Sequence, residues 1–244
     1  MPDDFRGPPF PPPGYPPEPP REPPQPPQPP TGMGDVTLDV LVSRRGPVTT
    51  ALLAVIVAVS LAGFFVPGVI DALAKENEGI RHGELWRLFT PALVHGSLLH
   101  LFVNMSALAA VGRVAEGLYG GRGFLVAFVL GTGAASATSY AFTANPSVGA
   151  SGGLFAIVGT LLAFAVRHRG VLPEAARRRM IRGELFTVAI NVAFGFMVPY
   201  VDNAAHLGGV AAGFVIGLVL PPGRLAAARL KALGRARDRT IIVR

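Results

Sequence analysis

Long apolar segments separated by short polar breaks dominate the sequence after residue 48. Six such segments are recognisable, at roughly 49–70, 97–112, 123–144, 150–166, 185–200 and 204–220. A helix needs about 17 to 25 mostly apolar residues to cross a bilayer. We therefore expect an all-α, polytopic membrane protein, a bundle of six transmembrane helices. Because several segments are near the lower length limit, local bilayer thinning or a protein-lined polar recess is also expected.

The first 32 residues have a different character, because they hold 16 of the 24 prolines. Such a segment has too little apolar surface to form a core and favours extended polyproline II. The sequence thus predicts a proline-rich disordered region at 1–46, a helical membrane domain at 47–222 and a basic tail at 223–244. The proline-rich region is either a spacer or a ligand for proline-binding domains. It is not expected to be a secretory signal, since the first apolar run begins near residue 49.

Composition narrows the class of protein further. Half of the residues are hydrophobic and 15% are charged, against about 25% charged in soluble domains. The net charge of +7 could suggest a nucleic-acid partner. However, the arginines lie in loops and in the tail, with no continuous basic face and no nucleic-acid motif. We expect no nucleic-acid partner. The absence of cysteine excludes disulfides, thiolate metal sites and a cysteine nucleophile.

The distribution of basic residues predicts the orientation in the membrane. With six spans, 19 of the 22 lysines and arginines fall on one side. The other three are Lys75, Arg81 and Arg87. Both termini are therefore expected in the cytoplasm, with the multi-pass chain in a bacterial cell membrane. The loop at 71–96, the uncharged stretch at 145–149 and the turn around Asp202 would face outward.

This orientation places several polar residues at one depth. The second, fourth and sixth helices all begin on the outer side, so His100, Asn104, Ser151 and His206 fall in the outer half of the bilayer. Polar groups within a membrane are costly, so several at one level indicate a functional site.

Ser151 is predicted at the N-terminus of the fourth helix, within Gly149-Ala150-Ser151-Gly152-Gly153. This run matches the G-x-S-x-G elbow of soluble hydrolases, but no strand precedes it, so that interpretation is rejected. Unpaired N–H groups at a helix start can stabilise an oxyanion, and glycines let a substrate backbone approach. The alternative is a helix cap with small-residue packing.

His206 precedes a glycine face on the sixth helix. Gly209, Gly213 and Gly217 recur every four residues, which allows another helix to approach closely. His206 lies three residues before Gly209 and therefore near the same face. If the partner is the fourth helix, a neutral imidazole could take the proton of Ser151. The alternative is a histidine that only hydrogen-bonds between helices.

Five further polar residues lie near the predicted outer side or within the helices, and each is interpreted as supporting the site or as structural. His100 and Asn104 lie one helical turn apart and can both donate hydrogen bonds, which suits an oxyanion site or structural hydrogen bonding. His95 and Asn191 are interpreted as structural. Asp202 is expected to cap the sixth helix. Since no other acid lies in the outer halves of helices 2, 4, 5 or 6, a Ser–His dyad is predicted rather than a triad.

Five motifs in order resemble the rhomboid family of intramembrane serine proteases, over roughly residues 80 to 217. They are Glu84-Leu85-Trp86-Arg87, the run from His95 through His100 to Asn104, Gly112-Arg113 with Glu116 and Gly120, Gly149-Ala150-Ser151-Gly152, and His206 with Gly209 and Gly213.

The resemblance implies Ser151 as nucleophile and His206 as general base. It also implies an oxyanion hole from His100, Asn104 and the Ser151 amide, with Gly149, Gly152, Gly209 and Gly213 in support. Trp86 and Arg87 would lie in an interfacial loop. Phe155 stands where the family often has a tyrosine stacked on the histidine, and it can still stack. No metal or cofactor is implied.

Substrates are expected to be single-pass transmembrane proteins whose helices unwind at the cut, because helical hydrogen bonds shield the scissile bond. Three other functions are weighed. A small transporter would need polar groups through the full membrane depth. A non-catalytic adaptor that binds membrane helices would be expected to lack Ser151 or His206. A membrane-tethered soluble-type esterase would need strands that the sequence does not predict.

Overall fold

The structure is a computed structural model that describes residues 46–224, 226–228 and 231–232. All of these belong to one compact unit. The predicted proline-rich region, apart from residue 46, and most of the predicted basic tail lie outside the described residues.

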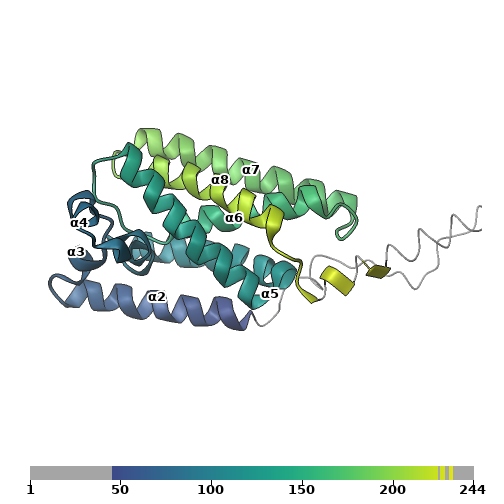
Figure 1. Cartoon of the computed structure of the whole chain (residues 1–244), viewed down its shortest axis with the longest axis horizontal. Coiled ribbons are helices and arrows are strands. Elements are labelled where there is room, and N and C mark those ends of the chain that lie inside the picture. Colours follow the sequence, from purple (N-terminus) through teal and green to yellow (C-terminus); the bar gives the residue numbers. More distant parts are fainter. Residues whose placement is uncertain (1–45, 225, 229–230, 233–244) are drawn as a thin grey trace, which may run out of the picture. The chain divides into compact units, whose positions relative to one another are not determined.

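The described part of the chain is helical, with a single isolated β-bridge between Lys75 and Ser147 (Figure 1). The elements in order are α2 (Pro47–Phe65), α3 (Val69–Leu73), α4 (Asn77–Arg81), η1 (Leu85–Leu88), η2 (Thr90–Leu93), α5 (Leu98–Phe142), α6 (Ser151–Arg167), α7 (Glu174–Met197) and α8 (Asn203–Val219). By length and composition, α2, α5 and α7 could each cross a membrane, while α6 and α8 are apolar but shorter. The helical fold class is confirmed, and the number of spans stays a prediction.

The 45-residue helix α5 combines the second and third predicted segments. Gly120, with φ of 76°, divides it into two parts. The predicted end near residue 112 was wrong, because the helix continues through Glu116 to this kink. Glu116 is a polar break in the sequence pattern, yet it is buried and accepts hydrogen bonds from Val48 N, Thr49 N and Thr49 Oγ1. These donors let a carboxylate stay inside the bundle.

Two other predicted boundaries were also wrong. The first segment was expected to run to residue 70, but α2 ends at Phe65, and Pro67 and Gly68 (φ 82°) separate it from α3. Helix α7 begins at Glu174, well before residue 185. In its basic first turns Glu174 pairs with Arg177 and Arg178, and each such pair gives a helix a small stabilisation.

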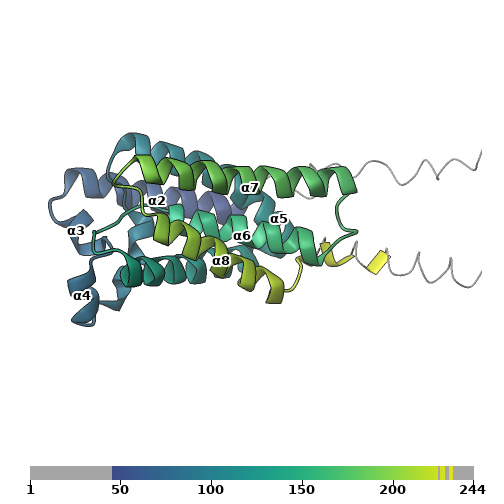
Figure 2. The ribbon, with the colours of Figure 1, turned by 90° about the horizontal axis from the view of Figure 1, so that it is seen from above.

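Helix α6 runs through the middle of the helices of this unit (Figures 1 and 2). Every residue from Gly153 to Ala165 is buried. Helix α7 is the opposite case, since Met180 is its only buried residue. Large apolar side chains such as Phe65 and Phe196, each 82% exposed, face outward. Outward apolar surface of this kind suits a hydrocarbon environment.

The glycine face of α8 packs against α6, which is the fourth predicted helix and the partner on which a contact between His206 and Ser151 depends. A Cβ on Gly209 would lie 2.4 Å from the Gly152 oxygen, and one on Gly213 would lie 1.9 Å from the Ala156 oxygen. From the opposite side, a Cβ on Gly159 would lie 2.2 Å from the Val210 oxygen. Backbone therefore meets backbone along this crossing, which only residues without a side chain permit. The crossing fixes the spacing of the two helices.

The α2–α5, α5–α6 and α7–α8 connections gather at one end of this unit, and the α6–α7 connection lies at the other end (Figures 1 and 2). Figure 1 shows α3, α4 and the α5–α6 and α7–α8 connections together, opposite the beginning of α2 and the end of α8. Hydrogen bonds join these loops: Ser147 pairs with Lys75, Gly149 N donates to the Pro91 oxygen, and Ser139 of α5 contacts Asp202. Both α6 and α8 begin at this end, so Ser151 and His206 meet there.

Candidate active site

Ser151 and His206 are in direct contact. The Nε2 atom of His206 lies 3.0 Å from Oγ of Ser151. Ser151 is the first residue of α6, and His206 lies in the first turn of α8. Because the glycine crossing brings the two helices together, two residues 55 positions apart share a hydrogen bond. His206 is only 6% exposed, whereas Ser151 is half-buried. The hydroxyl is therefore the more accessible member of the pair.

The imidazole of His206 is held by an aromatic ring. Phe155, one turn along α6 from Ser151, stacks on it with ring centroids 4.3 Å apart and an interplanar angle of 30°. The stacking needs no phenolic hydroxyl, so phenylalanine serves here. If Nε2 accepts the proton of the serine hydroxyl, the ring proton resides on Nδ1. Phe155 thus limits the rotation of a ring whose Nε2 faces the serine.

Among the described residues, no carboxylate bonds the other nitrogen of this histidine. Nδ1 of His206 is buried and has no hydrogen-bond partner in the described part of the chain. Asp202, the nearest acid in sequence, is occupied elsewhere: Oδ1 accepts from Ala205 N at 2.9 Å, and Oδ2 accepts from Ser139 Oγ. Asp202 is therefore an N-cap of α8. In the part of the chain that the structure describes, the geometry is that of a Ser–His pair without a third acidic member.

His100 lies against the turn that precedes Ser151. Ser97 caps α5 by accepting from His100 N at 3.1 Å, which places His100 in the first turn. Gly149 adopts φ of 118°, and a Cβ there would lie 2.6 Å from Cε1 of His100. Both the backbone angle and the closeness of the ring require glycine at this position. The imidazole of His100 thus borders the same turn that carries the serine.

Asn104 lies one turn below His100 and donates from Nδ2 to the His100 backbone oxygen at 3.0 Å. Its Oδ1 is buried without a partner among the described residues. The amide nitrogen carries two protons, so one N–H remains for another acceptor. The first N–H groups of α6 likewise have no acceptor within the helix. The use of these donors in catalysis stays a prediction.

His95 bonds the turn that precedes Ser151. Its Nε2 accepts from Ala150 N at 3.3 Å. Since Nε2 is the acceptor, Nδ1 carries the proton and donates to Ser60 Oγ at 2.9 Å, and Ser60 donates to the Leu93 oxygen. His95 is completely buried and lies edge-to-face against His100 at 4.9 Å. These contacts fit the predicted structural role.

The remaining predicted residues lie away from the Ser–His pair. Trp86 donates from Nε1 to the Ala72 oxygen at 3.3 Å. Arg87 binds Glu84 and the backbone oxygens of Asp71 and Ala74, so this motif braces the loop around α3. Asn191 donates to the Thr187 oxygen of its own helix.

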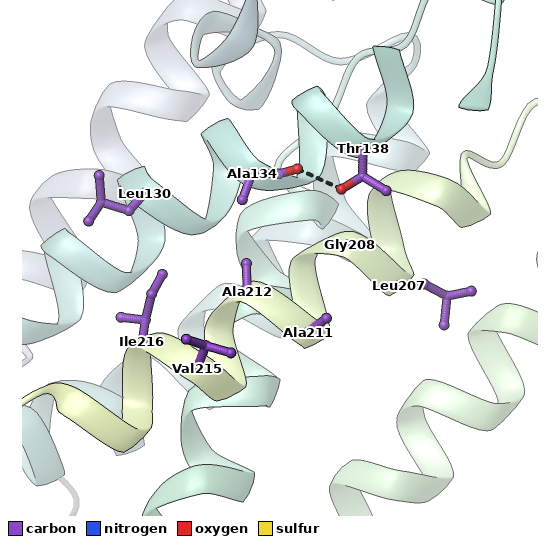
Figure 3. Close-up of a pocket in the computed structure, with 9 residues that line it drawn as sticks. All are labelled: Leu130, Ala134, Thr138, Leu207, Gly208, Ala211, Ala212, Val215 and Ile216. Atoms are coloured by element: carbon purple, nitrogen blue, oxygen red, sulfur yellow. Dashed lines mark hydrogen bonds between the residues drawn. The ribbon is translucent and has the colours of Figure 1, made fainter. Parts of the chain in front are cut away.

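A shallow apolar groove lies between the second part of α5 and α8 (Figure 3). It is lined by Leu130, Ala134, Thr138, Leu207, Gly208, Ala211, Ala212, Val215 and Ile216. Neither Ser151 nor His206 lines it, and its one hydroxyl, on Thr138, donates to the Ala134 oxygen of the same helix. Within the described residues, no three His, Asp or Glu side chains gather as a metal site. The groove is separate from the Ser–His pair.

Comparisons with known proteins agree with the sequence motifs. The Rhomboid domain family matches residues 82–223. The rhomboid protease GluP of Bacillus subtilis (strain 168) is 38% identical over 141 residues, which is 58% of this chain and 27% of GluP. RHOMBOID-like protein 5 of Arabidopsis thaliana is 32% identical over 163 residues, which is 66% of this chain and 52% of that protein. An inactive relative, RHOMBOID-like protein 8 of Arabidopsis thaliana, is 31% identical over 127 residues, which is 52% of this chain and 35% of that protein.

The likeness concerns the helical region of the chain. It covers about half or less of each relative's length. The matched region of the family includes the helices α5, α6, α7 and α8 and both residues of the Ser–His pair. The chain therefore belongs to the rhomboid family of helical integral membrane proteins.

Proposed function

We propose that this chain is an intramembrane serine endopeptidase in which Ser151 and His206 form a catalytic dyad. The observation that carries the proposal is the 3.0 Å contact between Nε2 of His206 and Oγ of Ser151. A serine hydroxyl is a weak nucleophile unless an adjacent base removes its proton. The likeness to a named rhomboid protease gives further support.

In this mechanism, His206 takes the proton of Ser151 as Oγ attacks the scissile carbonyl. The developing oxyanion would accept hydrogen bonds from the Ser151 amide, from the free N–H of Asn104 and from His100. His206 would then give its proton to the leaving amine, and water would hydrolyse the acyl-enzyme with His206 again as base. Every proton transfer passes through one imidazole, whose orientation Phe155 holds by stacking. No metal or cofactor takes part in any of these steps.

The proposed substrates are single-pass transmembrane proteins. A helical segment hides its carbonyl carbon within its own hydrogen bonds, so the segment must unwind before Oγ can reach it. Small or helix-breaking residues near the cut would make this unwinding easier. In the membrane, both termini would lie in the cytoplasm and the dyad would lie toward the outer leaflet. Trp86 and Arg87 would lie in a loop at the membrane interface. A proline-binding domain could also recognise the proline-rich region, which lies outside the described residues apart from residue 46.

An adaptor without catalytic activity is the second candidate, because the family includes an inactive relative. The hydrogen-bonded pair favours the protease, since an adaptor has no need of an imidazole aimed at a serine. A transporter is less favoured. Buried polar groups do occur far from the dyad, as at Glu116 and Thr49, but they bond to each other. A path for a solute would need polar groups free to bind it.

The test uses the full chain purified in detergent, with a fluorescent transmembrane peptide and a fluorophosphonate probe. The wild type should cleave the peptide and become labelled at Ser151, as mapped by mass spectrometry. Ser151→Ala should do neither. Cleavage that persists in Ser151→Ala would rule out Ser151 as the nucleophile. A wild type that binds the peptide without cleaving it would favour the adaptor.

The absence of a third acidic member predicts a mild effect of Asp202→Asn. Asparagine caps helices about as well as aspartate, and its Oδ1 can still accept from Ala205 N. We therefore expect turnover to stay within about tenfold of wild type, because the substitution removes no contact to Nδ1 of His206. The measurement is kcat on the same peptide. A loss as large as that of Ser151→Ala would show that a triad operates.

A further inference from the structure

Lys75 is a charged side chain that the sequence pattern assigns to an exposed loop, yet it is completely buried. Its ammonium group donates to the Thr143 backbone oxygen at 3.1 Å and to the Asn145 backbone oxygen at 3.0 Å. A longer contact of 3.5 Å reaches Thr143 Oγ1. All of these acceptors belong to the end of α5 and the connection that leads to Ser151.

The backbone of Lys75 holds the same connection a second time. Lys75 N donates to the Ser147 oxygen at 2.9 Å, and Ser147 N donates back to the Lys75 oxygen at 3.0 Å. This is the isolated antiparallel bridge of the structure. Ser147 lies four residues before Ser151, and Gly149 and Ala150 between them are tied to Pro91 and His95. The loop at 71–96 therefore bonds the turn before Ser151 at Ser147, Gly149 and Ala150. Among the described residues that make these bonds, Lys75 is the charged one.

A chain of hydrogen bonds also links Lys75 to the start of α8, the helix that carries His206. Thr143 Oγ1 lies 3.0 Å from Ser139 Oγ, and Ser139 donates to Oδ2 of Asp202. The other oxygen of Asp202 caps α8 at Ala205, the residue before His206. A continuous set of polar contacts thus runs from the ammonium group to the start of the helix that carries the base.

Burying a lysine is costly, so its retention calls for a compensating contact. Burial lowers the pKa of Lys75, while the negative charges of Asp202 and Glu76 oppose that decrease. The ammonium group is thus favoured by a carboxylate at the start of α8 and by carbonyls of the α5–α6 connection. Methionine could fill a similar volume without the desolvation cost. Packing alone therefore does not explain a lysine here.

We propose that Lys75 is a positioning residue that sets the alignment of Ser151 with His206 by bonding the α5–α6 connection and, through Thr143 and Ser139, the Asp202 cap of α8. The inference rests on the proposed dyad. The glycine crossing fixes the distance between the axes of α6 and α8. The direction of Oγ depends in addition on the turn that enters α6, because Ser151 is the first helical residue. A misplacement of about 1 Å can cost about 100-fold in rate.

The experiment compares Lys75→Met with Lys75→Arg in the full chain, purified in detergent. Lys231→Met is the matched control, since Lys231 is the chain's other lysine and is exposed. We expect Lys75→Met to lower kcat and the rate of fluorophosphonate labelling by about 10- to 100-fold. KM should stay within about twofold, because no substrate contact is removed. Lys75→Arg should recover most of the loss, and Lys231→Met should behave as wild type.

Each rate is divided by the concentration of active sites, measured as the amount of protein labelled by the fluorophosphonate at completion. A variant with a smaller folded fraction is then not mistaken for one with slower chemistry. Ser139→Ala provides a second variant that interrupts the contacts between Thr143 and Asp202. If Lys75 acts through Ser139, the effects of the two substitutions on labelling rate should not add in the double variant. Amide hydrogen exchange provides a readout that needs no catalysis. Exchange in 143–150 should rise in Lys75→Met and stay unchanged in Lys231→Met.

Two results would overturn the proposal. One is a Lys75→Met variant whose kcat per labelled site equals that of wild type. The other is unchanged amide exchange in 143–150 of that variant. If the wild type neither cleaves nor labels, the protease proposal fails by itself. The exchange measurement then still shows whether Lys75 stabilises the connection at 143–150 that leads to Ser151.

Discussion

Replacing His206 with alanine should lower peptide-bond hydrolysis by about 10⁴- to 10⁶-fold, the range seen when one member of a serine-protease triad is removed. The reason is the position of the base: Nε2 is the only imidazole nitrogen within hydrogen-bond distance of Ser151 Oγ in the described structure. Without it, the serine proton has no acceptor, and the hydroxyl stays a weak nucleophile. The measurement is the initial rate of cleavage of the transmembrane peptide, together with the rate of fluorophosphonate labelling.

His82→Ala is the matched control, because His82 is an exposed histidine at the end of α4. It should leave both rates at the wild-type level. The double variant Ser151→Ala/His206→Ala should be no slower than either single variant, since two groups that act as one unit give non-additive losses. A His206→Ala variant within tenfold of wild type would contradict the role of His206 as general base.

The second large effect concerns the crossing of α6 and α8. Gly213→Ala should destabilise the fold by about 1 to 3 kcal/mol or more, the range for overpacking of a close-packed interior. A Cβ at this position would lie 1.9 Å from the Ala156 oxygen. That obstacle is backbone and cannot rotate away, so the helices must separate. The midpoint of unfolding in mixed detergent–denaturant micelles gives the change in stability.

Gly183→Ala is the control with the same chemical change. Gly183 is also helical, in α7, but a Cβ there has nothing within 4 Å. Alanine should stabilise this position by up to about 1 kcal/mol through helix propensity. The two substitutions are therefore expected to act in opposite directions. Equal effects at both sites would mean that the crossing is looser than these contacts indicate.

The main helices could be predicted from the sequence because they depend on local periodicity. The meeting of Ser151 with His206 was expected on the condition that the fourth helix is the partner, and from the family resemblance. Apolar length marks the helices, and glycines at every fourth position mark the face of α8 that meets another helix. The candidate partner for that face was the fourth helix, whose start is equally rich in glycine. A sequence pattern is sufficient to predict a contact when the residues of the pattern themselves form the contact surface, as the glycines of α8 do.

Polar residues held by distant partners could not be predicted in this way. Glu116 lies in the polar break after the apolar segment at 97–112, yet Thr49, 67 positions earlier, makes its burial possible. Lys75 counts as an outward charge, yet its acceptors lie about 70 positions later. Whether a charged residue ends a helix or enters a core depends on such remote donors and acceptors. Periodicity contains no information about them.

The enclosure of α6 has a consequence for how the protein responds to bilayer thickness. A 17-residue helix is shorter than the about 20 residues that usually cover the hydrocarbon layer. Since protein buries every residue from Gly153 to Ala165, lipid tails do not reach this stretch, and no hydrophobic mismatch arises along it. A thicker or thinner membrane is expected to change first the tilt of α2 and α7, whose surfaces are mostly exposed. The depth of Ser151 within its protein surroundings would stay the same.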